Sequence, residues 1–199
     1  KDETRYFART FGFNLRWKGT PEKIIICKNT NDVAYYLQIA VNANKKVTIG
    51  SGYHCYENFI MNNNKGVQFD LTQMADLKEY HNNNRHDTSN LIYAEPGIYN
   101  WNSTLSLWSE YGKYLPGGSC YSVCLGGHIC GGGYGLDSRR DGLTVDYLQG
   151  IEMVVVDKNK KVKVITKFKD ELSKQDQNYW WCCTGGGGQS FGIITKYIF

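Results

Sequence analysis

Proline and long apolar runs are both scarce in this chain of 199 residues. It has 3 prolines against 22 glycines, so its turns depend on glycine. The aliphatic runs are short, as at residues 24–27 and 153–156. A membrane-spanning helix needs about 20 apolar residues, so we expect no membrane span and no membrane partner.

A large charge of one sign is also missing. The 23 Lys and Arg residues nearly balance the 19 Asp and Glu residues, which leaves a net charge of +4. A nucleic-acid binder would cluster its basic residues on one face, so we expect no nucleic-acid partner. Apolar residues at 41% and charged residues at 21% are typical of one globular domain or of two small lobes.

The chain begins Lys1-Asp2, with neither Met nor an apolar leader. We therefore expect either that a signal peptide was removed or that the residues come from inside a longer chain. Seven cysteines are an odd number, so at least one sulfur has no disulfide partner within the chain. We favour secretion over a cytoplasmic location, although the cysteine count by itself does not decide between the two compartments.

The first part of the chain alternates strand and helix signals. Residues 24–27 and 46–49 predict strands, and Thr30 or Asn31 is the expected cap of the helix between them. Strand, helix and strand in this order predict a βαβ unit with parallel strands. A third strand is expected at residues 67–71.

The rest of the chain is predicted to be mixed. The expected elements are strands at 91–95, 148–156, 161–165 and 191–199, a helix at 101–111 with helical spacing through Trp101, Leu105 and Trp108, and a long glycine-dense loop at 116–135. The second and third of these strands should form a hairpin. The predicted fold class is α+β, with a small parallel α/β lobe over about 20–75 and a larger mixed lobe over about 90–199.

Three glycine-rich segments could carry chemistry. They are Gly50-Ser51-Gly52-Tyr53-His54-Cys55, then Pro116 to Gly135 with Gly126-Gly127-His128 and Gly131-Gly132-Gly133-Tyr134-Gly135 inside it, and finally Trp180-Trp181-Cys182-Cys183-Thr184 followed by four glycines. A glycine turn at a strand end brings backbone N–H groups toward a pyrophosphate. Residues without side chains let a flat ligand lie against the backbone. A Gly-Ser-Gly turn by itself is more often an ordinary loop.

Together, the three segments resemble the flavin-binding domain of the berberine bridge enzyme-like oxidases, within the vanillyl-alcohol oxidase and p-cresol methylhydroxylase family. The family pattern Arg-Ser-Gly-Gly-His matches residues 50–54. The later pattern of a Cys, Gly-Gly-His and Gly-Gly-Gly-Tyr-Gly matches Cys120, residues 126–128 and residues 131–135. The resemblance covers nearly the whole chain, from about Arg5 onward, and the ordered set of motifs is specific.

The resemblance implies an FAD attached at two points. It assigns His54 to the 8α-methyl of the flavin and Cys120 to flavin carbon 6, and it places Val123 where the family controls access of dioxygen. Without it, His54 is more often a turn histidine, Cys120 a buried thiol and Val123 a packing residue. The full set of implied cofactor-binding residues is His54, Cys120, Ser51, Gly52, Tyr53, Cys55, Gly117, Gly118, Ser119, Val123, Gly126, Gly127, His128, Gly131, Gly133, Tyr134, Gly135 and Ile193.

Several positions depart from the family pattern. Gly50 replaces an Arg, Tyr53 replaces a Gly beside the pyrophosphate, and Cys124 stands where Gly is common. The Tyr53 ring must then point outward or along the adenosine side. These departures leave open a degenerate relative with weakened cofactor binding. Four residues, Cys120, Cys124, His128 and Cys130, also look like zinc ligands, but the glycine-dense context suits a closed zinc site poorly, so we expect no metal.

The resemblance implies part of an oxidase that takes electrons from an alcohol of a sugar or secondary metabolite and passes them to dioxygen, giving hydrogen peroxide. The substrate domain and the catalytic base are expected outside this chain, in the remainder of the polypeptide or on a second chain. We name no catalytic residue here. The alternative is a non-catalytic storage, binding or toxin-associated protein that reuses the fold.

Overall fold

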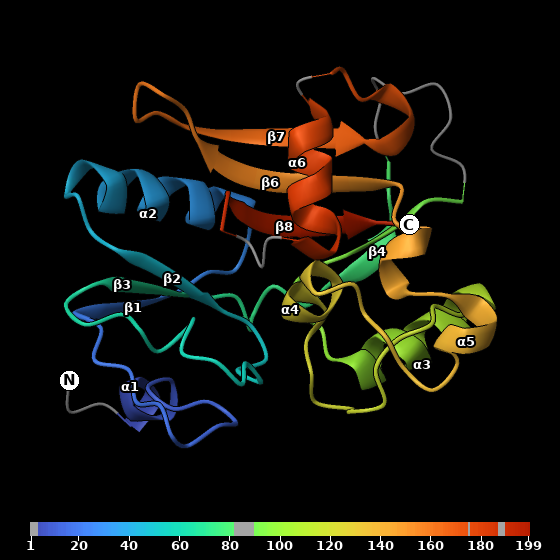
Figure 1. The fold of residues 1–199 in the computed structure, drawn as a ribbon, viewed down its shortest axis with the longest axis horizontal. Coiled ribbons are helices and arrows are strands. Elements are labelled where there is room, and N and C mark those ends of the chain that lie inside the picture. Colours follow the sequence, from blue (N-terminus) through green and yellow to red (C-terminus); the bar gives the residue numbers. More distant parts are fainter. Residues whose placement is uncertain (1–3, 82–89, 175, 187–189) are drawn as a thin grey trace.

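Two sheets organise the chain in the computed structural model, which describes residues 4–81, 90–174, 176–186 and 190–199. The strands are β1 (Lys23–Ile26), β2 (Val47–Gly50), β3 (Val67–Asp70), β4 (Leu77–Glu79), β5 (Ile92–Ala94), β6 (Gly150–Val156), β7 (Val162–Phe168) and β8 (Ile193–Ile198). The first three strands form one sheet and the other five form the second, as Figure 1 shows. The predicted α+β fold class is confirmed.

The small sheet is parallel throughout, in the order β1-β3-β2. The prediction of parallel strands around a helix is therefore correct. However, β1 and β2 do not pair with each other, because the third strand lies between them. All four residues of β3 are buried, since a central strand is covered on both faces.

The helix that connects β1 and β2 is α2 (Thr30–Asn42). Its cap is Asn29, whose side chain accepts a hydrogen bond from the backbone N–H of Asp32, so the predicted cap, Thr30 or Asn31, was one or two residues too late. Leu37 and its neighbours pack on the small sheet and also on Val154 and Ile193 of the large sheet. Figure 1 accordingly shows α2 lying between the two sheets.

The large sheet has the order β4-β5-β8-β6-β7, and each of its pairings is antiparallel. The predicted hairpin of β6 and β7 is confirmed. Its turn is fixed by Asp157, whose Oδ1 accepts from the backbone N–H groups of Asn159 and Lys161 at 2.8 and 2.9 Å. Strand β4 was missed, because three residues with two charges give too short a pattern to read.

Helix α3 (Asn100–Tyr111) forms where the sequence predicted it, but a different face is buried. Trp101, Leu105 and Trp108 are exposed, while Asn100, Ser103 and Leu107 are buried. The reason is local bonding: the Asn100 side chain donates to the carbonyl of Cys120 at 3.2 Å, and Ser103 donates to the Asn100 carbonyl at 2.9 Å. Hydrogen bonding to the glycine-rich segment thus turns the polar face inward.

The segment predicted as one long loop contains a helix, α4 (Leu125–Cys130). Leu125 and Ile129 bury themselves one turn apart, and the Tyr197 hydroxyl donates to the Gly126 carbonyl at 2.7 Å. This packing overrides the poor helix propensity of the two glycines. The remaining helices are short: α1 (Thr4–Ala8), α5 (Ser138–Asp141) and α6 (Asp176–Trp181), with helical turns at Thr144–Tyr147, Lys169–Glu171 and Cys182–Gly186.

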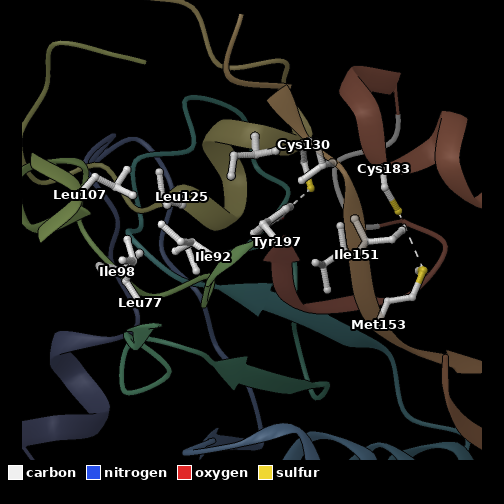
Figure 2. Close-up of a cluster of buried hydrophobic side chains, with 14 of the residues drawn as sticks. Leu77, Ile92, Ile98, Leu107, Leu125, Cys130, Ile151, Met153, Cys183 and Tyr197 are labelled. Carbon is white, nitrogen blue, oxygen red and sulfur yellow. Dashed lines mark hydrogen bonds between the residues drawn. The ribbon is translucent and has the colours of Figure 1, made fainter. Parts of the chain in front are cut away.

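The main core lies under the large sheet, where β5, β6 and β8 meet α3 and α4 (Figure 2). Tyr197 is fully buried and its hydroxyl lies 3.1 Å from the Cys130 sulfur. Cys183 reaches Met153 from the opposite end of the cluster. Burial of these side chains joins the glycine-rich segment to the sheet.

Within the described ranges, none of the helices combines the length and apolarity that crossing a membrane requires. His81 is exposed and lies 3.5 Å from Glu79, as expected for a solvated loop histidine. His86, the Asn82–Asn84 run and two glycines of the third motif, Gly187 and Gly188, lie outside the described residues.

Candidate functional site

The main cavity of the described residues has a volume of about 1110 Å³ and is lined by segments from both lobes. It is lined by the loop after β2, by the glycine-rich segment around α4, and by Gly185 and Gly186 of the third motif. Pockets for drug-sized ligands measure about 300–1,000 Å³, so this cavity suits a larger molecule such as a dinucleotide.

Most of the predicted cofactor-binding residues line this cavity. They are Ser51, Gly52, Tyr53, His54, Cys55, Gly118, Ser119, Cys120, Val123, Gly127, His128, Gly131, Tyr134 and Gly135. The sequence reasoning did not single out Phe13, Asn100 or Asn62, which also line it. These three residues lie outside the glycine motifs and reach the cavity wall only when the chain folds. The motifs therefore could not predict them.

Four predicted residues lie away from the cavity wall. Gly117 lines a smaller cavity of about 190 Å³, and Ile193 is buried between the sheets. Gly126 and Gly133 act through packing: a Cβ on Gly126 would lie 2.9 Å from Pro96, and one on Gly133 would lie 2.3 Å from Thr144 Oγ1. These two glycines permit close approach rather than contact with a ligand.

His54 projects from the loop after β2. Its Nε2 lies 3.0 Å from Ser122 Oγ, and the Phe13 ring stacks on the imidazole with centroids 5.1 Å apart. Burial lowers the pKa of His54, so the imidazole is neutral near pH 7 and keeps one unprotonated nitrogen. A neutral, oriented imidazole is the form that can act as a nucleophile.

Cys120 is the exposed cysteine of the second motif. Its sulfur lies 3.9 Å from the same Ser122 hydroxyl, while its carbonyl accepts from Asn100 Nδ2 and from the Val123 N–H at 3.3 Å. The backbone is therefore held while the sulfur stays accessible. The fold thus brings the two predicted tether residues to one hydroxyl.

Of the two orientations expected for the Tyr53 ring, outward or along the adenosine side, the structure excludes the outward one. The φ of Tyr53 is +58°, a left-handed conformation that favours glycine, and this explains the family's glycine at this position. The ring turns back under the loop, where the hydroxyl accepts from buried Gln68 at 3.0 Å. A Cβ on Gly50 would lie 2.7 Å from the Tyr53 ring, so the ring occupies the space that a side chain at position 50 would need.

A buried carboxylate lies beside this ring. Asp70 is fully buried, pairs in register with Gly50, and accepts from the Thr72 hydroxyl at 2.6 Å. Its other oxygen forms an ion pair with Arg9, which comes from the segment after α1. Burial, with the nearby Asp70 charge, raises the pKa of Tyr53 far above its usual range, so the phenol stays protonated.

His128 organises the second motif from inside. Its Nε2 accepts from the backbone N–H of Gly118 at 2.9 Å, which leaves the proton of the neutral imidazole on Nδ1. Burial lowers the pKa of His128 and favours this neutral form. A Cβ on Gly118 would lie 2.8 Å from the His128 ring, so the glycine is needed for the contact.

The other cysteines of the segment are occupied. Cys124 donates to the Gly97 carbonyl at 3.1 Å, and Cys130 lies against the Tyr197 hydroxyl. Burial raises the pKa of the Cys124 thiol to about 12. Among the residues that the structure describes, no three His, Cys, Asp or Glu side chains gather as a metal site requires. All seven cysteines lie in the described part and are free thiols.

The residues fit a flavin. Gly127 faces the cavity with open space where a side chain would stand, because a Cβ there would meet no atom within 4 Å. His54 and Cys120 supply two nucleophilic atoms at the wall, and bare backbone at Gly127 and Gly131 leaves room for a flat ring.

Comparison with known proteins identifies the class. The family described as FAD binding domain matches residues 21–162, which is well over half of the chain. The chain belongs to this family of FAD-dependent oxidoreductases, as its resemblance to berberine bridge enzyme-like proteins implied.

The curated relatives that the chain matches include oxidases. The chain is 34% identical to the aclacinomycin-N/aclacinomycin-A oxidase of Streptomyces galilaeus over 96% of its own length and 34% of that protein. It is 36% identical to the hexose oxidase of Chondrus crispus, covering the whole chain and 36% of that protein. The chain thus spans about a third of the length of these relatives.

One similar solved structure contains an FAD that is attached to its own protein through a cysteine and a histidine. The glucooligosaccharide oxidase from Acremonium strictum, which carries a 6-S-cysteinyl, 8α-N1-histidyl FAD, is 25% identical. It superposes with a TM-score of 0.86 over all of this chain and 38% of the other.

Proposed function

We propose that this chain is the FAD-binding domain of a covalent flavoprotein oxidase, with lobes over about 20–75 and 90–199 and with FAD attached through both His54 and Cys120. The observation that carries the proposal is that these two side chains line the main cavity and both contact the hydroxyl of Ser122, which lies behind them. The histidyl and cysteinyl FAD of the glucooligosaccharide oxidase supports it.

FAD, when bound, takes a hydride equivalent from an alcohol and passes the electrons to dioxygen, which is released as hydrogen peroxide. The residues of this chain hold and shape that site. Bare backbone at Gly127 and Gly131 admits the ring, and Val123 forms part of the wall with a small side chain that leaves room for dioxygen. The names of the hexose oxidase and the aclacinomycin oxidase support an alcohol of a sugar or secondary metabolite as the substrate.

The substrate domain and the catalytic base are proposed to lie in the remainder of the polypeptide or on a second chain, because this chain spans about a third of its relatives. We therefore expect that residues 1–199 produced alone bind FAD but oxidise no substrate. Vigorous oxidase activity from residues 1–199 alone would contradict this division of labour.

The covalent assignment is tested by denaturing the full-length protein. Flavin should stay with the acid-precipitated protein and add one FAD to its intact mass. His54→Ala and Cys120→Ala should each keep the flavin through the remaining tether, and only the double variant should release it. Cys182→Ala is the matched control, because it removes a half-buried thiol that lies outside the cavity lining. Release of FAD from the unmutated protein would reject the double tether and favour a degenerate relative with weakened cofactor binding.

A further inference from the structure

Ser122 stands beside both tether residues without lining the main cavity. Its hydroxyl lies 3.0 Å from His54 Nε2 and 3.9 Å from Cys120 Sγ. It lines a second cavity of about 540 Å³, whose wall also includes His54 and Cys120. The two tether residues thus lie between Ser122 and the space proposed for FAD. From this place Ser122 can position His54 and Cys120, but it does not contact the ligand itself.

The turn that carries Ser122 is fixed by its neighbours. The Val123 N–H donates to the Cys120 carbonyl at 3.3 Å, and the Asn100 N–H donates to the Val123 carbonyl at 2.9 Å. The Asn100 side chain adds a bond to the Cys120 carbonyl at 3.2 Å. On the other side, the Phe13 ring stacks on His54. The turn that carries Ser122 and Cys120 and the imidazole of His54 are therefore both held in place by their neighbours.

A serine hydroxyl has one hydrogen and two lone pairs, so it can donate to only one of these partners. If its oxygen accepts from Nε2–H, the Nδ1 of His54 is left unprotonated and the hydroxyl hydrogen is available to the Cys120 sulfur. If it donates to Nε2, the proton of the neutral imidazole stays on Nδ1. Only the first arrangement exposes a lone pair on Nδ1 and also stabilises a thiolate, which is the nucleophilic form of cysteine.

We propose that Ser122 prepares both tethers for bonding to FAD: its oxygen accepts the Nε2–H of His54 while its hydrogen is donated to the Cys120 sulfur. This inference rests on the proposed double attachment. Each attachment forms one C–N or C–S bond, and one hydrogen leaves the flavin carbon and one leaves the side chain. The two electrons released are taken by dioxygen, the acceptor of the proposed oxidase, which leaves as hydrogen peroxide. Ser122 itself forms no covalent bond.

The test uses the full-length protein prepared without flavin and then mixed with FAD in air. Attachment is followed by flavin fluorescence on denaturing gels and by intact mass. Ser122→Val and Ser122→Thr have matched shapes and differ in the hydroxyl. We expect Ser122→Val to slow attachment about tenfold, since it loses hydrogen bonds of ordinary strength, and Ser122→Thr to remain within about threefold of the unmutated rate. Ser109→Ala is the control, because Ser109 donates only within α3, to the Leu105 carbonyl.

A second measurement does not depend on attachment. Nitrogen NMR of ¹⁵N-histidine-labelled, flavin-free protein reports the tautomer of His54, assigned with His54→Gln. We expect a proton on Nε2 in the unmutated protein and in Ser122→Thr, and a mixture of tautomers in Ser122→Val. A role limited to folding would leave the tautomer unchanged.

The outcomes separate the two proposals. If the unmutated protein attaches no flavin, the double tether is wrong, and the tautomer alone decides the role of Ser122. Attachment at unchanged rates in Ser122→Val would overturn the inference about Ser122 and leave the double tether standing. A proton on Nδ1 in the unmutated protein would overturn it as well.

Discussion

The contact between Gly50 and Tyr53 predicts that the two positions are energetically coupled. Gly50→Ala places a methyl group 2.7 Å from Cζ and 2.8 Å from Cε1 of the Tyr53 ring. Overpacking of this kind costs about 1–3 kcal/mol. The nearest atoms belong to a ring whose hydroxyl is bonded to buried Gln68, so the ring cannot move away without losing that bond.

Tyr53→Gly has two opposing effects. Removing a half-buried aromatic side chain costs at most about 3–5 kcal/mol, the range typical of a core position. Placing glycine at a φ of +58° relieves left-handed strain of about 1–2 kcal/mol. The net loss should be at most about 1–4 kcal/mol. The substitution also removes the ring against which a side chain at position 50 would clash.

The coupling is measured with a double-mutant cycle in urea unfolding. In the Tyr53→Gly background, Gly50→Ala should cost nothing measurable, so the cycle should give a coupling of about 1–3 kcal/mol. Each kcal/mol corresponds to about 2–4 °C in the unfolding temperature of a chain of this size. Gly127→Ala is the control, because its Cβ meets no atom within 4 Å, and its effect should be equal in both backgrounds. Costs that add to within about 0.5 kcal/mol would refute the reasoning.

Two further changes test the site. Val123→Leu enlarges the cavity wall and should slow reoxidation of the reduced protein by dioxygen about tenfold, or about 1.4 kcal/mol of barrier, with the reduction step unchanged in stopped-flow traces. An equal effect on both steps would reject the gating role. Arg9→Met leaves buried Asp70 without its ion pair and should cost about 2 kcal/mol, less than a fully buried pair because Arg9 is one-third exposed. Adding Asp70→Asn should recover part of that loss in urea unfolding, and no recovery would show that the pair contributes little.

The elements that the sequence predicted well are those whose pattern matches their burial. The hairpin of β6 and β7 has β-rich runs around a polar turn, and α2 has an apolar stripe that packs on both sheets. The apolar spacing of α3 does not coincide with its buried face, because Asn100 and Ser103 turn inward to bond with the glycine-rich segment and with each other. Hydrophobic periodicity carries no information about such bonds.

The site was predicted by motif order, and this limits what could be foreseen. His54 and Cys120 were found because each stands at a fixed place in a glycine motif. Ser122 and Phe13 were not, because their contacts with His54 arise from long-range folding. The missed helix α4 has the same cause: Leu125 and Ile129 gain burial that local propensity cannot report.

The departures from the family pattern are better explained as mutual adjustments than as decay. Gly50 lacks the side chain that the family has there, and Tyr53 fills the vacated space. The buried carboxylate opposite Gly50 receives its positive partner from Arg9. Random loss of function would leave either a buried Asp70 without a cation or an empty space beside Gly50. Either defect would destabilise the fold.

Cys124 fits the same interpretation. Its backbone nitrogen packs closely against Gly52, because a Cβ on Gly52 would lie only 2.7 Å from that nitrogen. Its thiol is buried, bonded to the Gly97 carbonyl and raised in pKa to about 12, so little thiolate forms near neutral pH. Cys120, four positions earlier in the chain, keeps its sulfur exposed beside Ser122. The segment therefore presents one accessible nucleophilic sulfur to the cavity while it adds a second cysteine to the core, and the extra thiol does not compete for the proposed linkage.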